Sequence, residues 1–124
     1  GRIEALPDKS LSDRQCRDIK RYVEQHLADP LLSIGQIAEV HRTSKRYLHW
    51  LFRSEPMTLN EFIIFRRLEQ CRRCLLDLDR AHLHVSQIAY AWGFANVSHF
   101  SKRYRALFNE SPTQTRQSVH ARSA

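Results

Sequence analysis

One apolar pattern occurs twice in this chain, and the second copy begins 51 residues after the first. Each copy opens with an Ile-Ala pair and closes with two large apolar residues four positions apart: Ile37-Ala38 with Leu48 and Phe52, then Ile88-Ala89 with Phe100 and Tyr104. Residues four positions apart lie on one face of a helix. The repeat therefore predicts two copies of one unit, in which a short helix, a tight turn and a second helix follow one another.

The composition favours an all-α fold. The chain has 124 residues with only three Gly and four Pro, and it lacks the alternating Val, Thr and Tyr runs that indicate strands. A chain of this length forms one domain or two very small ones that share a core, and it has no room for a separate effector domain. We expect about seven helices, arranged as two helix-turn-helix modules joined by a long linker helix.

Capping residues set the expected helix boundaries. A Ser, Thr or Asn that can accept a hydrogen bond from a free backbone N–H stands before six of the periodic runs: Ser12, Ser33, Ser44, Thr58, Asn96 and Ser111. The predicted helices span residues 12–29, 34–40, 44–54, 59–76, 85–92, 96–108 and 112–118.

These helices divide the chain into segments. The predicted domain covers residues 12–118, between a flexible leading segment (1–11) and a frayed tail (119–124). Within it we expect a first module at 12–56, a linker helix at 58–76 and a second module at 85–118. Gly93 suits a left-handed turn between the paired helices of the second module.

The chain is strongly basic. Twenty Lys and Arg against 13 Asp and Glu give a net charge of +7, which favours a polyanionic partner, nucleic acid before an anionic membrane. No stretch approaches the roughly 18 consecutive apolar residues of a membrane span, and the first residues lack the apolar core of a signal peptide. Three cysteines, an odd number, indicate reduced thiols. We expect a soluble, cytoplasmic protein, and the absence of Met at position 1 indicates a piece cut from a longer chain.

A helical-wheel construction separates the faces of the second helix in each module. The residues expected to face inward are Leu48, Leu51 and Phe52 in the first module and Phe100, Tyr104 and Leu107 in the second. The opposite faces carry mainly basic and hydroxyl side chains and almost no carboxylates: Arg46, His49, Trp50 and Arg53, with Lys45 near the helix start, then Ser98, His99, Ser101, Lys102 and Arg105. Such side chains donate to guanine O6 and N7, to other base edges or to phosphates. The alternatives are an ordinary solvated face and, for Trp50, packing on a neighbouring helix.

Other reactive side chains do not assemble into a site. Cys71 and Cys74 lie three residues apart, but zinc needs four ligands and no second pair follows. Cys71 fits a core position and Cys74 is a candidate oxidation target, while His82 and His84 fit solvent-facing or capping positions. No Ser/His/Asp set, carboxylate pair or phosphate-cradling loop is present. We predict no metal, no cofactor, no catalytic residue and no enzymatic activity.

Three segments closely resemble the C-terminal signature of the AraC/XylS family of bacterial transcription regulators: Ile88-Ala89-Tyr90-Ala91-Trp92-Gly93-Phe94, Asn96-Val97-Ser98-His99-Phe100-Ser101-Lys102 and Phe108-Asn109-Glu110-Ser111-Pro112. The resemblance covers residues 11–118 and is stronger in the second half. It implies a seven-helix domain that binds as a monomer to two successive major-groove faces on one side of the duplex, with its recognition helices about 34 Å apart.

The wheels and the resemblance together give the candidate site. The base-reading residues are Arg46, His49, Trp50, Val97, Ser98, His99, Lys102 and Arg105, where Val97 is included by resemblance alone. The phosphate-binding residues are Ile34 through its backbone amide, Arg42, Lys45, Arg53, Ser101, Arg103 and Arg116.

Four residues depart from the family pattern. Arg42 stands in a turn that often has Gly, Pro56 and Asn109 replace other glycines, and Thr115 replaces an aromatic residue. We therefore expect differently shaped turns in the first module and looser packing of the last helix. The change at Asn109 is mild, because Asn tolerates positive φ.

The expected function is sequence-specific binding of double-stranded DNA by a transcription regulator. The resemblance implies an activator that contacts RNA polymerase, and many such regulators carry an N-terminal effector-binding and dimerisation domain, here outside this chain. The alternative is a basic helical adaptor that binds an acidic protein or membrane surface.

Overall fold

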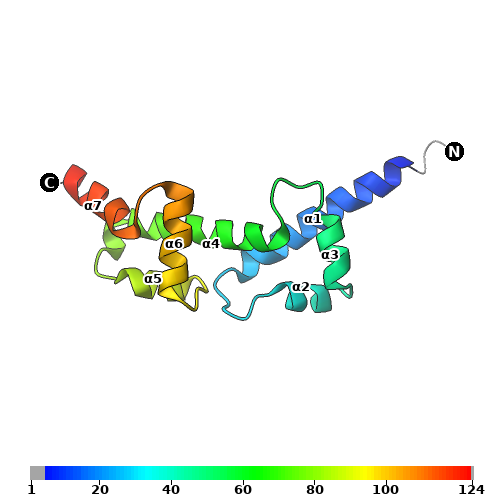
Figure 1. The fold of residues 1–124 in the computed structure, drawn as a ribbon, viewed down its shortest axis with the longest axis horizontal. Helices are drawn as coiled ribbons and strands as arrows, with labels where there is room; N and C mark the ends of the chain where they lie inside the picture. The colour runs from blue at the N-terminus through cyan, green and yellow to red at the C-terminus, as the bar shows by residue number, and fades with distance from the viewer. Residues whose placement is uncertain (1–4, 124) are drawn as a thin grey trace. The chain divides into compact units, whose positions relative to one another are not determined.

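The computed structural model describes the backbone of residues 5–123 and the side chains of residues 10–119. This part of the chain is all helical, which confirms the predicted fold class. The helices are α1 (Ala5–His26), α2 (Ile34–Val40), α3 (Lys45–Leu51), α4 (Leu59–Leu75), a short 3-10 helix η2 (Leu78–Arg80), α5 (Val85–Ala91), α6 (Val97–Phe108) and α7 (Pro112–Ser123) (Figure 1). None of the helices described combines the length and the apolar character needed to traverse a bilayer.

The chain packs into two compact units. Unit 1 comprises α1, α2, α3 and the start of α4, and unit 2 comprises Leu27–Pro30, the rest of α4 from Ile64, and α5 to α7. Helix α4 was predicted as a spacer, yet it supplies buried residues to each unit: Leu59 and Ile63 to unit 1, then Leu68, Cys71 and Leu75 to unit 2. The limits of the units therefore differ from the predicted segments at 12–56, 58–76 and 85–118.

In unit 1, α3 is fixed to α1. Cys16, Ile19 and Val23 form the buried stripe of α1, and the Cys16 thiol donates to the backbone carbonyl of Leu51 at 3.4 Å. The Tyr47 hydroxyl donates to Gln15 Oε1 at 2.5 Å. Burial raises the pKa of the Cys16 thiol, with a further contribution from the nearby Glu55 carboxylate. The thiol stays protonated at neutral pH and remains a donor.

In unit 2, the core forms where α4, α5 and α6 meet. Its buried members are Leu68, Cys71, Cys74, Leu75, Ile88, Ala89, Phe100 and Tyr104. The Trp92 indole N–H and the Arg80 guanidinium both donate to the Cys74 sulfur, at 3.3 and 3.2 Å. Cys74 is buried, so the prediction that it is an oxidation target is wrong. Among the described residues, no group of His, Cys, Asp and Glu is arranged to hold a metal ion.

The two predicted turns have the same backbone hydrogen bonds. In unit 1 the N–H of Thr43 donates to Ala38 O at 2.9 Å, and in unit 2 the N–H of Phe94 donates to Ala89 O at 3.0 Å. The residue before each donor is left-handed, Arg42 with φ 53° and Gly93 with φ 94°. This arrangement is the Schellman motif, which satisfies the last carbonyls of a helix. The sequence repeat is thus a structural repeat.

Several helix starts agree with the predicted caps. Ser33, Ser44, Asn96 and Ser111 each accept a backbone N–H from three residues ahead, and Thr58 forms a reciprocal capping box with Glu61. Asn109 is left-handed at φ 59°, as expected for an Asn that replaces Gly.

Four helix ends differ from the prediction. Helix α1 ends at His26, three residues before the predicted Asp29. Helix α1 begins at Ala5 and not at Ser12, so residues 5–11, expected as a flexible segment, are helical. Pro7 lies in the first turn of α1, where a missing backbone N–H costs nothing. Residues 1–4 lie outside the described residues. Helix α7 continues to Ser123 through the expected tail, because no Gly or Pro interrupts residues 119–123; Ala124 lies outside the described residues.

Helix α3 ends at Leu51, three residues before the predicted Ser54. Pro56 disfavours helical backbone at the preceding residue, Glu55. The Glu55 carboxylate is instead bonded to Lys20 of α1. The segment after α3 is therefore held by a contact that is distant in sequence.

The packing of α6 and α7 corrects two further predictions. The inward stripe of α6 follows i, i+4, i+8: Phe100 and Tyr104 are buried, and the half-buried Phe108 ends it with its ring centre 4.6 Å from that of Tyr104. Leu107, expected to face inward, is 38% exposed. Thr115 is fully buried, accepts the Tyr104 hydroxyl at 2.7 Å and donates to the Glu110 carboxylate. The prediction that Thr115 loosens the last helix is therefore wrong, because its hydroxyl joins α6 to α7.

Candidate nucleic-acid interface

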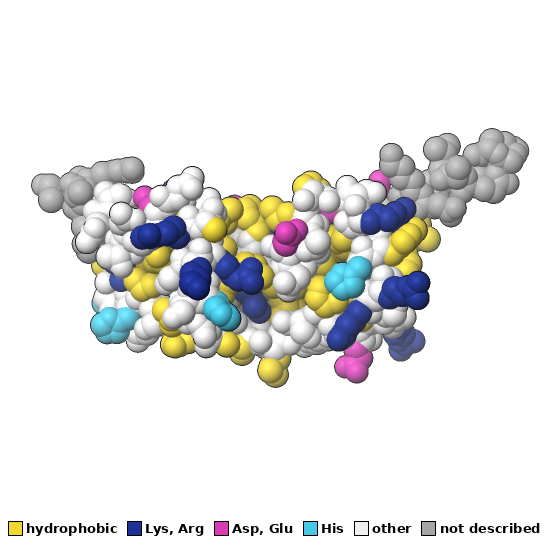
Figure 2. All heavy atoms as spheres, in the orientation of Figure 1, with side chains coloured by type: hydrophobic (Ala, Val, Ile, Leu, Met, Phe, Trp, Pro, Cys, Tyr) yellow, Lys and Arg dark blue, Asp and Glu magenta, His cyan; other side chains and the backbone are white. Residues whose placement is uncertain are grey.

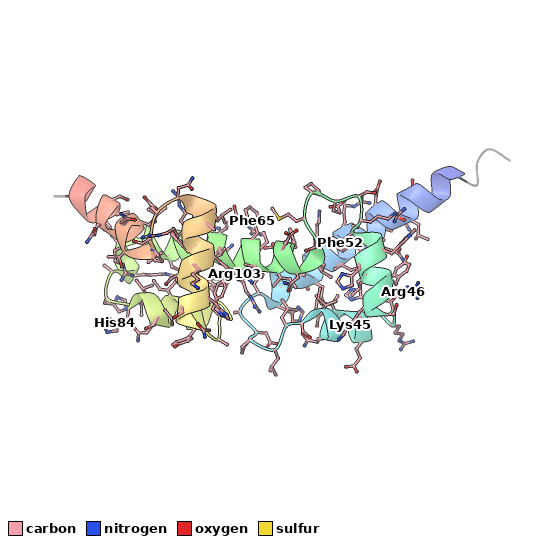
Figure 3. All side chains as sticks on the ribbon, in the orientation of Figure 1. Lys45, Arg46, Phe52, Phe65, His84 and Arg103 are labelled. Atoms are coloured by element: carbon pink, nitrogen blue, oxygen red, sulfur yellow. The ribbon has the colours of Figure 1, made fainter. Side chains whose placement is uncertain are left out.

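Helix α3 presents a polar face to solvent. Ser44 caps it, so the helix begins at Lys45, and Leu48 and Leu51 turn into the core. Arg46, His49 and Trp50 lie opposite these two residues and are all exposed, as the helical wheel predicted. Lys45 and Arg46 lie toward the helix start (Figure 3).

Lys45 crosses the beginning of α2. A Cβ built on Gly35 would lie 3.1 Å from Lys45 Cε, so the lysine stem runs over the first turn of α2. This turn carries the backbone amide of Ile34, which was predicted to bind phosphate. The structure thus brings two predicted phosphate contacts together, a lysine ammonium and the amides of a helix start.

Arg42 occupies a backbone conformation that costs energy. Its φ of 53° lies in the left-handed region, which is unfavourable by about 1 kcal/mol or more for a residue with a Cβ. The side chain is exposed and comes directly before the segment that leads into α3. The equivalent turn in unit 2 has Gly93.

Trp50 lies in a small cluster of side chains. The Arg53 guanidinium carbon lies 3.8 Å from the centre of the Trp50 ring, and Arg53 also donates to the Trp50 backbone carbonyl at 2.9 Å. The Tyr47 ring stacks on the Trp50 ring with centres 5.5 Å apart. Arg53 was predicted to bind phosphate, but the structure folds it onto Trp50. Sequence reasoning missed Tyr47, although its i, i+3 spacing from Trp50 indicated the contact.

Helix α6 presents a second polar face. Asn96 caps the helix, and Phe100 and Tyr104 turn into the core. Ser98, His99, Lys102, Arg103 and Arg105 are exposed, whereas Val97 and Ser101 are half-buried. Lys and Arg side chains gather over α6 in the space-filling view (Figure 2). Lys102, Arg105 and Ser101 also border a hollow of about 340 Å³ beside the start of α7.

The basic side chains divide into two groups. Arg67 and Arg116 bond backbone carbonyls, and Lys20 and Arg66 bond carboxylates. In contrast, Arg46, Lys102 and Arg105 have no hydrogen-bond or ion-pair partner among the described residues. The charge on the exposed faces of α3 and α6, called the reading faces below, is therefore not neutralised within this part of the chain.

Arg116 does not belong to the interface. Its guanidinium donates to Leu83 O at 2.6 Å and to Arg80 O at 3.4 Å, and the residue is half-buried. This arginine ties α7 to the loop before α5, so we remove it from the predicted phosphate contacts.

Comparisons with known proteins show the family to which the chain belongs. The family model described as a helix-turn-helix domain matches residues 37–118. Transcriptional activator NphR of Rhodococcus sp is 38% identical over 104 residues, which cover 84% of this chain and 30% of that protein. Transcriptional activator RhrA of Rhizobium meliloti is 33% identical over 99 residues, covering 80% of this chain and 31% of that protein. The chain thus spans about a third of the length of these curated relatives.

Solved structures have the same fold. A probable AraC family transcriptional regulator from Rhodopseudomonas palustris superposes with a TM-score of 0.74 at 28% identity, covering 83% of this chain and 94% of that one. The C-terminal domain of the response regulator yesN from Fusobacterium nucleatum gives a TM-score of 0.75 at 21% identity, covering 83% and 98%. The predicted resemblance is confirmed: the chain belongs to the AraC/XylS-type family of helix-turn-helix DNA-binding domains of transcription regulators, a family without enzymatic activity.

Proposed function

We propose that this domain binds double-stranded DNA in a sequence-specific manner, with α3 and α6 inserted into successive major-groove faces. The observation that carries the proposal is the pair of capped helices whose exposed faces hold basic side chains with no partner among the described residues. An unneutralised cation on a groove-sized helix donates to guanine or phosphate acceptors. The base-reading set is Arg46, His49, Trp50, Val97, Ser98, His99, Lys102 and Arg105.

The proposed phosphate contacts fix the register of each module. They are the Ile34 amide, Arg42, Lys45, Ser101 and Arg103, with Arg53 assigned to the support of Trp50 and Arg116 to the fold. Phosphate contacts position a protein on the duplex but carry no sequence information. Their loss is therefore expected to weaken binding to all sequences alike.

The wider role proposed for the protein rests on its relatives. NphR and RhrA are named as transcriptional activators, and this chain matches about a third of each. We infer that the protein activates transcription in the bacterial cytoplasm through contact with RNA polymerase. We further infer that an effector-binding and dimerisation domain accompanies this one in the full regulator.

Substitution of a base-reading residue tests sequence specificity. Arg46→Ala and Lys102→Ala should each weaken binding to a DNA obtained by random-sequence selection more than binding to unrelated DNA, by about 1 to 3 kcal/mol. Fluorescence anisotropy at fixed salt measures both affinities. Arg103→Ala is the matched control on the same helix, because the loss of a phosphate contact should weaken binding to both DNAs equally. Equal losses for Lys102→Ala would instead make Lys102 a phosphate contact.

Replacement of Arg42 separates stability from binding. Arg42→Gly should raise the free energy of unfolding by about 0.5 to 1 kcal/mol, because Gly adopts the left-handed turn without strain. The same change should weaken binding to all DNA and lower the slope of log K against log salt by about one. Arg42→Ala is the control, with the charge removed and the strain kept. If Arg42→Gly binds DNA like the unmodified chain, Arg42 does not contact phosphate.

A further inference from the structure

Trp50 is an unusual side chain on a basic reading face. It lies beside Arg46 and His49 on α3, and 46% of the residue is exposed. Tryptophan is enriched at interfaces, because its ring is largely apolar while its N–H can donate a hydrogen bond. The core does not take up the indole, since the core side of α3 is already filled by Leu48 and Leu51.

The ring is held in one orientation. Arg53 lies over the ring at 3.8 Å and Tyr47 stacks on it with 27° between the ring planes. The Tyr47 hydroxyl is bonded to Gln15 of α1, so this support is itself anchored. Arg53 and Tyr47 both contact the ring, and the Nε1–H has no hydrogen-bond partner among the described residues. We therefore take the ring edge, with its apolar C–H groups and this donor, as the part that is open to a partner.

The direction of approach is set by charge. On its α1 side Trp50 borders a groove of about 590 Å³ whose lining includes Asp13 and Glu55. The same lining includes Arg53, and Glu55 is bonded to Lys20, so this groove has no excess of basic charge to attract phosphate. The side of α3 that carries Arg46 and His49 has basic side chains and no carboxylate. DNA therefore meets the indole from the side that carries Arg46 and His49.

The chemistry of that edge selects one base. In the major groove only thymine combines a methyl group, which packs against an apolar edge, with an adjacent O4 that accepts a hydrogen bond. Cytosine offers a donor and no methyl, while the purines offer N7 and no methyl. An indole edge with one N–H matches the thymine pattern.

We propose that Trp50, held by Tyr47 and Arg53, is the thymine-selecting residue of the first module. This inference rests on the proposed function. Arg53 and Tyr47 act as positioning residues that fix the indole, and the contact is made by Trp50 itself.

Replacement of single thymines by uracil tests the proposal, since uracil keeps O4 and lacks the methyl. A DNA selected from random sequences by the 124-residue chain is substituted one thymine at a time, and each Kd is measured. At one position, in the half of the site that the first module contacts, uracil should weaken the binding of the unmodified chain about fourfold. This is the effect expected for one buried methyl group. At that position Trp50→Ala should bind both DNAs equally, and Trp50→Phe should keep part of the difference.

Further comparisons keep the test specific. His49→Ala is the matched control on the same face, and it should keep the uracil effect at the Trp50 position. Arg53→Ala and Tyr47→Phe keep the indole, so they should reduce the uracil effect without abolishing selection of the same site. Circular dichroism of each variant shows whether the helical fold is kept. If Trp50→Ala unfolds, Trp50→Phe is used in its place.

Two outcomes overturn the inference. In the first, no uracil substitution weakens binding by the unmodified chain. In the second, the uracil effect persists unchanged in both Trp50 variants. Failure of the proposed function appears differently, because the chain would then select no sequence and would give no position to substitute.

Discussion

Gly93→Ala should lower the free energy of unfolding by about 3 kcal/mol or more. This figure adds the strain of a left-handed alanine to the loss of a hydrogen bond from a charged donor. Gly93 has φ 94°, which a residue with a Cβ rarely adopts. A Cβ at this position would lie 2.7 Å from the guanidinium carbon of Arg67. Urea unfolding followed by circular dichroism measures the change.

Arg67 has little freedom to move away from that Cβ. It is 8% exposed and donates to Leu27 O at 2.9 Å and to Asp29 O at 2.7 Å. Burial lowers the pKa of its guanidinium and the nearby Asp29 carboxylate raises it, and the group is charged at neutral pH. Displacement would leave the buried carbonyl of Leu27 and the part-buried carbonyl of Asp29 without this donor.

A double-mutant cycle isolates this contact. In an Arg67→Ala background the steric conflict is gone, so Gly93→Ala should cost only the left-handed strain, about 1 to 2 kcal/mol. The two substitutions are then strongly non-additive. Additive free-energy losses would show that the side chain of Arg67 does not exclude a Cβ at position 93.

Phe100→Ala should destabilise the protein by about 3 to 5 kcal/mol. Phe100 is fully buried in unit 2, with ring centres 5.1 Å from Phe94 and 5.7 Å from Tyr104. Its truncation leaves a cavity beneath the reading face of α6. Thermal unfolding measures the loss, and binding to the selected DNA should fall with it.

Leu107→Ala is the matched control on the same helix. Leu107 is 38% exposed, so its truncation should change the stability by no more than about 0.5 kcal/mol. Comparable losses for Phe100→Ala and Leu107→Ala would contradict the packing of α6 described above.

Helix starts were the most predictable part of the fold. Ser33, Ser44, Thr58, Asn96 and Ser111 each bond a backbone amide three residues away. Such a bond depends only on neighbouring sequence, so residue types suffice to locate it. Ser12 shows the limit of this local prediction. The sequence from Ser12 to Gln15 fits a capping box, yet these residues lie inside α1.

Features set by distant contacts were not predictable in the same way. Nothing local indicates that Glu55 pairs with Lys20, or that Arg116 bonds the carbonyl of Leu83. Thr115 likewise gains its role only when α6 and α7 meet. The wheel predicted the exposure of Arg46, His49 and Trp50 on α3 and of Ser98, His99, Lys102 and Arg105 on α6. It was wrong for Leu107, which is exposed, and it did not predict that Arg53 folds onto Trp50.

Chemical footprinting of the selected duplex tests the central claim most directly. If α3 and α6 each read a major groove, the 124-residue chain should protect two major-groove patches about ten base pairs apart. Lys102→Ala should weaken the patch read by α6 more than the other one. A single protected patch, or uniform weak protection along the duplex, would contradict a two-helix reading of DNA.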